Sequence, residues 1–137
     1  MISWLGSMGR VQGVAVLAAI VLLVMSLFHL ALAAGLPWGV AAWGGKHRIL
    51  PPKLRAGSAA AAALLACAGV IILARGGVVA PGAHSMFVRA ASWALAAYFA
   101  VNTLGNLSSS SRVERVVMTP VAAMLAVCFA IVVLAKP

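Results

Sequence analysis

The chain has 137 residues, of which 65 % are apolar and 8 % are charged. A soluble domain of this length has too small an interior to bury so much apolar surface, so the composition excludes an ordinary soluble globular domain and predicts a protein surrounded by lipid. The net charge is +9, and Glu114 is the only acidic residue. Because the bases flank or separate apolar runs, we assign them to a membrane surface and expect no nucleic-acid partner.

Four apolar runs follow one another along the chain, at about 11–34, 56–74, 87–107 and 116–135. At a rise of about 1.5 Å per residue, each run is long enough to cross a hydrocarbon layer of roughly 30 Å. The pattern predicts an all-α membrane protein, in which residues 1–137 form a single domain, a bundle of four transmembrane helices.

The segment between the first two runs, residues 35–55, is the most distinctive part of the sequence. Gly35 to Pro37 should end the first helix, because proline cannot continue the helical hydrogen-bond ladder. Tryptophans suited to the head-group level and a cluster of bases follow. We predict a structured connector whose surface contacts lipid or a partner. Its candidate contact residues are Trp38, Trp43, Lys46, His47, Arg48, Lys53 and Arg55.

The second run is rich in small side chains, with alanine at every position of 59–63. Small residues let helices approach closely in lipid, so we expect this helix at the centre of the bundle. The two cysteines, Cys67 in this run and Cys128 in the fourth, lack metal-ligand spacing, and we interpret both as small buried apolar residues.

A polar stripe marks the third run. Tyr98, Asn102 and Asn106 recur every four residues and therefore share one helix face. In lipid, such side chains either hydrogen-bond between helices as structural contacts or line a site for a ligand, solute or ion. The same two alternatives apply to His29 in the first run. These four residues are the candidates for a ligand site or pore.

The fourth run begins with Ser111-Arg112-Val113-Glu114, which has the S-x-x-E form of a capping box. In that motif the serine hydroxyl accepts from the glutamate amide, and the glutamate side chain accepts from the serine amide. The alternative role for Glu114, as the only carboxylate, is proton transfer. Pro120, about two turns further on, predicts a kink.

Candidate catalytic chemistry is sparse. The serines at 108–111 lack a GxSxG turn and an aspartate, and the chain has no paired carboxylates and no metal-ligand cluster. His29, His47 and His84 supply at most one plausible axial pair for haem. We therefore expect no catalytic residue, no metal and no cofactor, and an enzyme is the least favoured class.

Several short motifs resemble those of a group of small four-span bacterial integral membrane proteins of unassigned function. The motifs are Leu36-Pro37-Trp38-Gly39, Ala42-Trp43-Gly44-Gly45, Leu50-Pro51, Leu54-Arg55, Asn102-Thr103-Leu104-Gly105-Asn106-Leu107 and Arg112-Val113-Glu114-Arg115. The resemblance implies four membrane spans and a location in the bacterial inner membrane. It implies no activity.

The loops after the first and third runs carry six bases, and the side that holds both termini carries four. By the positive-inside rule, this bias places the two loops in the cytoplasm and the termini outside. Our leading functional hypothesis is a binding or accessory role, in which the connector contacts membrane lipids, a second copy or a larger membrane partner. The alternative is an oligomeric transporter or channel that uses the stripe of Tyr98, Asn102 and Asn106.

Overall fold

The computed structural model of the chain describes residues 2–80 and 85–135, and every regular element within these ranges is helical. The elements in chain order are α1 (Ile2–Ala34), η1 (Gly39–Ala41), η2 (Trp43–Gly45), α2 (Pro52–Gly76), α3 (Met86–Leu107), η3 (Glu114–Met118) and α4 (Thr119–Leu134). The prediction of an all-helical protein is confirmed.

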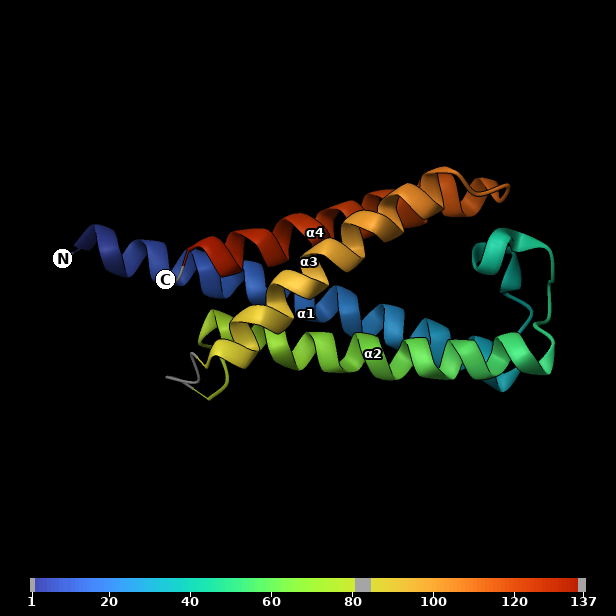
Figure 1. The fold of residues 1–137 in the computed structure, drawn as a ribbon, viewed down its shortest axis with the longest axis horizontal. Coiled ribbons are helices and arrows are strands. Elements are labelled where there is room, and N and C mark those ends of the chain that lie inside the picture. The colour runs from blue at the N-terminus through green and yellow to red at the C-terminus, as the bar shows by residue number, and fades with distance from the viewer. Residues whose placement is uncertain (1, 81–84, 136–137) are drawn as a thin grey trace.

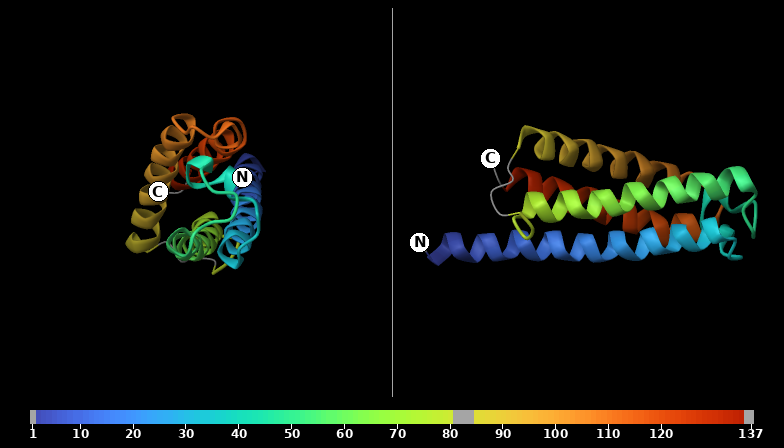
Figure 2. Two further views of the ribbon diagram at one scale, coloured as in Figure 1. Left: turned by 90° about the vertical axis from the view of Figure 1, so that its right-hand side faces the viewer. Right: turned by 90° about the horizontal axis from the view of Figure 1, so that it is seen from below.

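The long helices form an elongated bundle of two pairs, α1 with α2 and α3 with α4 (Figure 1). The connector between α1 and α2 lies at one end of the bundle, together with the corner between α3 and α4 (Figures 1 and 2). The start of α1 and the end of α4 lie toward the opposite end. The two loops with the larger number of bases therefore share one end.

Within residues 2–80 and 85–135, three helical segments are long and apolar enough to cross a membrane: Gly9–Ala34, Pro52–Gly76 and Glu114–Leu134, with mean hydropathies of 2.7, 2.2 and 2.6. Helix α3 is not among them, because Arg89 and the polar stripe lower its hydropathy. Many large apolar side chains of the bundle are exposed, as suits helices that face acyl chains.

The main core is one cluster to which all four long helices contribute. On α1, Ala15, Ala18 and Leu22 are buried, and Phe99 of α3 stacks on Phe129 of α4 with ring centroids 5.7 Å apart. The alanine run of α2 is mostly turned outward, with only Ala62 buried, although the helix as a whole contacts α1, α3 and α4. Buried positions on α2 recur every three or four residues, because one face alone packs on the other helices.

Two sequence expectations need correction. Helix α2 begins at Pro52, earlier than the predicted start at 56, because proline at the first helical position loses only an amide that has no helical partner. Lys53 and Arg55 therefore belong to α2 and not to the connector. Cys128 is buried as expected, whereas Cys67 is exposed on the outer face of α2.

The irregularity expected near Pro120 is a π turn over Glu114–Met118. Both the amide and the hydroxyl of Thr119 donate to the carbonyl of Glu114, the hydroxyl at 3.2 Å. Proline has no amide hydrogen and its ring collides with the carbonyl four residues earlier, so a wider turn before Pro120 relieves both conflicts.

Close contact between α1 and α2 at Gly76 gives a matched pair of test variants. A Cβ at Gly76 would lie 2.5 Å from the Cβ of Ala15, whereas a Cβ at Gly69 would lie 3.9 Å from that of Leu22. We expect Gly76→Ala to lower the free energy of unfolding by about 1–3 kcal/mol. Gly69→Ala should leave it unchanged or raise it by up to about 1 kcal/mol. Circular dichroism during titration with a denaturing detergent measures both, and equal midpoints would contradict the close contact.

Candidate functional site

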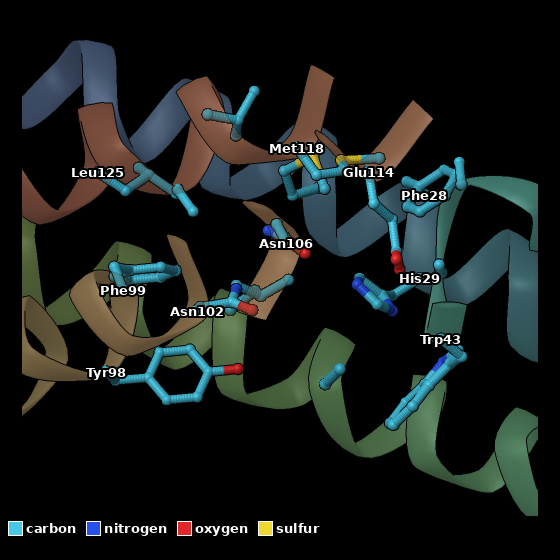
Figure 3. A pocket seen from close by; sticks show the side chains of 17 residues that line it. Phe28, His29, Trp43, Tyr98, Phe99, Asn102, Asn106, Glu114, Met118 and Leu125 are labelled. Carbon is cyan, nitrogen blue, oxygen red and sulfur yellow. The ribbon is translucent and has the colours of Figure 1, made fainter. Parts of the chain in front are cut away.

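A cavity of about 230 Å³ lies between the two helix pairs, near the connector end (Figure 3). Every long helix and the connector contribute to its wall. The lining residues are Met25, Phe28, His29, Ala41, Ala42, Trp43, Ala61, Leu65, Tyr98, Phe99, Asn102, Asn106, Glu114, Met118, Val121, Ala122 and Leu125. The four residues that the sequence suggested for a ligand site or pore all belong to this single cavity.

The stripe of α3 supplies one wall of the cavity. The amides of Asn102 and Asn106 and the hydroxyl of Tyr98 point into the same opening (Figure 3). Within the part of the chain that the structure describes, none of these three side chains hydrogen-bonds to the protein. Of the two roles that the sequence left open, interhelical hydrogen bonding is therefore not seen for the stripe among residues 2–80 and 85–135.

His29 enters the cavity from α1, on the side opposite the stripe. Its Nδ1 atom is buried and has no hydrogen-bond partner among residues 2–80 and 85–135. The ring meets Phe28 edge-on, with ring centroids 5.5 Å apart. Figure 3 shows the imidazole and the Glu114 carboxylate pointing toward each other. A buried polar atom without a partner is unfavourable in an apolar environment, so His29 is suited to hold a ligand.

Glu114 forms only half of the predicted capping box. The Ser111 hydroxyl accepts from the Glu114 amide at 3.3 Å, but the Ser111 amide donates to the Ser109 hydroxyl at 3.0 Å. The Glu114 carboxylate is buried and accepts instead from the Gly44 amide at 3.2 Å and from the Ser109 hydroxyl. The second hydrogen bond of the capping box, from the Ser111 amide to the Glu114 side chain, is therefore not formed. The carboxylate has partners in the connector and the corner instead.

The serines at the corner fasten it to the connector. The hydroxyl of Ser110 donates to the carbonyl of Gly44 at 3.1 Å, and the hydroxyl of Ser111 donates to that of Val40 at 2.6 Å. Together with the Glu114 carboxylate, these bonds hold the connector over the end of the cavity. Sequence reasoning missed this role, although four serines beside a glutamate supply many side-chain partners for a loop.

Trp43 lies over the cavity and is more than a head-group anchor. Its indole nitrogen donates to the hydroxyl of Ser58 at 3.0 Å, and a Cβ at Gly57 would lie 3.0 Å from the indole ring. The ring thus packs directly on the backbone of α2. Gly44 follows with a φ of 81°, a left-handed conformation that glycine adopts without strain.

The other connector candidates divide into two groups. Arg55 is structural, because its Nε donates to the carbonyl of Ala33 at 2.7 Å and its guanidinium packs against Gly35. Trp38 stacks on Phe28 with ring centroids 6.4 Å apart and remains exposed. The remaining candidates, all exposed at the connector end, are Lys46, His47, Arg48 and Lys53.

Among the described residues that line the cavity, Glu114 is the only charged one, and none is a lysine or arginine. Within residues 2–80 and 85–135, no group of three or more His, Cys, Asp and Glu side chains could hold a metal ion. For haem, His47 is exposed on the connector and does not line the cavity, and His84 lies outside the described residues. The lining therefore consists of hydrogen-bonding groups, aromatic rings and one carboxylate.

Fold and site together define a helical protein with three helices capable of crossing a membrane and a polar cavity at one end of the bundle. Comparisons of the chain with protein-family models, with curated proteins and with solved structures find no match. The function must therefore be argued from the cavity itself.

Proposed function

We propose that the chain is a four-span integral membrane protein that binds a small molecule in the cavity between its helix pairs. The observation that carries this proposal is the set of polar groups without protein partners. The side chains of Tyr98, Asn102 and Asn106 and the Nδ1 atom of His29 make no hydrogen bond to the described residues, although they share one cavity. Of these groups the His29 Nδ1 atom is buried, whereas Tyr98 and Asn102 are exposed at the opening. A bound molecule that hydrogen-bonds to this nitrogen would offset the cost of holding it away from water.

Helix α3 is the fourth span in this proposal. Its polar side lines the cavity, and its outer side carries apolar residues such as Val101 and Leu104, which are 68 % and 64 % exposed. Such a helix can sit in lipid when its polar face meets a cavity or a bound molecule. Tyr98 is 41 % exposed, which leaves a route from the bundle surface to the stripe.

We place the protein in the bacterial inner membrane, as its motifs resemble those of bacterial four-span proteins. The connector end would face the cytoplasm, because the loop bases and the bases of the first turns of α2 gather there. Exposed Lys46, Arg48 and Lys53 can contact anionic lipid head groups at that end, beside the indole of Trp38. This surface would serve the accessory contacts expected of the connector.

Native mass spectrometry of the gently extracted protein tests the proposal. We expect a reproducible small-molecule adduct on the wild-type chain and its loss from Asn102→Leu, which keeps the side-chain size and removes the amide. Val101→Leu, on the outer face of the same helix turn, is the matched control and should retain the adduct. Spectra that show only bulk phospholipid on both the wild-type chain and the control would overturn the proposal.

Transport is the second candidate function, and the exposure of Tyr98 beside the cavity favours it. A single bundle of four helices leaves little room for a lumen, so transport would require a second copy to complete the route. Flux of the bound molecule into liposomes separates transport from binding alone.

A further inference from the structure

We propose that the ligand of this cavity is an organic ammonium cation with a small apolar body. The inference rests on the proposed binding function and specifies its ligand class. It follows from three properties of the lining, namely its charge, its hydrogen-bond acceptors and its aromatic faces.

Charge is distributed unevenly between the cavity and the rest of the molecule. The chain carries ten Lys and Arg residues and a single acidic residue. None of the bases in the described part of the chain lines the cavity, whereas the one carboxylate, Glu114, does. At the edge of a bilayer the effective dielectric constant is low, so this carboxylate attracts a cation and repels an anion more strongly than it would in water. Phosphate and carboxylate ligands are thereby disfavoured.

The Glu114 carboxylate retains capacity for a ligand. Each of its oxygens accepts one hydrogen bond, from the Gly44 amide and from the Ser109 hydroxyl. An ionised carboxylate offers about four acceptor positions, so roughly half of them remain. The bonds from Gly44 and Ser109 also fix the carboxylate in place, which lowers the entropy lost when a cation binds.

Other acceptors converge on the same opening. The amide oxygens of Asn102 and Asn106 and the phenol oxygen of Tyr98 point in from α3, and His29 points in from the opposite side (Figure 3). An ammonium group presents up to three N–H donors. This set therefore matches a primary or secondary ammonium group better than a quaternary one.

The rest of the lining suits the apolar body of such a cation. Aromatic rings come from Phe28, Trp43, Tyr98 and Phe99, and Met118 adds a polarisable thioether. Aromatic faces attract cations, and they do so more strongly when water is excluded. At about 230 Å³ the cavity is smaller than the roughly 300–1,000 Å³ typical of sites for drug-sized ligands, so the body should be no larger than one ring or a short chain.

Three probes of matched shape test the inference: benzylammonium, benzyl alcohol and benzoate. Calorimetric titration uses the full chain in nanodiscs of zwitterionic lipid, with heats from empty nanodiscs subtracted. We expect benzylammonium to bind at least about tenfold more tightly than benzyl alcohol, and benzoate not to bind. Equal affinities for the ammonium and the alcohol would overturn the ammonium class and leave the binding function intact.

Two variants test whether the preference for benzylammonium over benzyl alcohol arises in the cavity. Glu114→Gln removes the charge and should abolish the tenfold advantage of benzylammonium while benzyl alcohol binds as before. Asn102→Leu removes an acceptor without touching the bonds between corner and connector, so it keeps the test valid if Glu114→Gln fails to fold. Arg112→Gln, at an exposed corner residue that does not line the cavity, is the control and should retain the preference.

The failures of the two proposals differ. If no probe binds but the native protein carries an adduct sensitive to Asn102→Leu, the ammonium class is wrong and the binding function stands. If neither a probe nor an adduct is found, both proposals are wrong.

Discussion

Replacing Glu114 with alanine is expected to loosen the attachment of the connector to the corner between α3 and α4, which the Ser110 and Ser111 hydroxyls then hold alone. The substitution removes the acceptor of the Gly44 amide and of the Ser109 hydroxyl in one step. Hydrogen bonds to a charged group contribute about 1.5–3 kcal/mol each, and their donors would be left unpaired. We expect the free energy of unfolding to fall by about 3 kcal/mol, measured by circular dichroism during titration with a denaturing detergent.

A local readout accompanies this global one. Lys46 and Arg48 are exposed in the connector, so a released connector should be cut by trypsin after either residue while the helices stay intact. Glu114→Gln is the graded comparison, because its amide oxygen can still accept one of the two bonds and the loss should be about half. Wild-type stability and trypsin resistance in Glu114→Ala would show that the carboxylate does not fasten the connector.

The second large effect is expected at Gly39, where the connector folds back on itself. The Gly39 amide donates to the carbonyl of Arg48 at 2.8 Å. A Cβ at this position would collide with the backbone carbonyl oxygens of His47 and Arg48. Because backbone atoms cannot yield as a flexible side chain does, Gly39→Ala should break the fold of the connector and lower the free energy of unfolding by about 2–3 kcal/mol.

Trypsin cleavage and unfolding midpoints check this expectation with the same protocol. Gly105→Ala is the matched control, because a Cβ there meets no atom within 4 Å. In a helix this change should be neutral or stabilise by up to about 1 kcal/mol. Identical behaviour of the two alanine variants would mean that the close approach at Gly39 is not needed for the connector fold.

Sequence patterns predicted the helices well because their determinants are local. Helix α1 ends just before Gly35 and Pro37, as expected. Helices α3 and α4 begin and end within three residues of the predicted limits, when the π turn before α4 is not counted as part of it. The periodicity of Tyr98, Asn102 and Asn106 placed them on one face, and the structure adds that this face lines a cavity. Periodicity could not predict what that face contacts, because a polar stripe has the same sequence pattern whether it packs on another helix or lines a cavity.

The fold of the connector and the role of Glu114 could not be predicted, because their determinants are not local. Their hydrogen bonds join residues 66 to 71 positions apart, and a local motif such as a capping box carries no information at that separation. Trp43 illustrates the same point. A tryptophan side chain suits a membrane interface, but Trp43 packs against Gly57 and hydrogen-bonds to the hydroxyl of Ser58, which places its ring over the cavity.

The bond between Gly44 and Glu114 also imposes an order on biosynthesis. Helices α1 and α2 with the connector are complete while the ribosome is still translating the residues of α3, because the two partners lie 70 residues apart. The α1–α2 hairpin can therefore form first, and the α3–α4 hairpin packs on it afterwards. The cavity wall needs residues from both helix pairs, so it forms only after the second pair packs on the first. Under the proposed function, a ligand would then bind only to chains that have been completed.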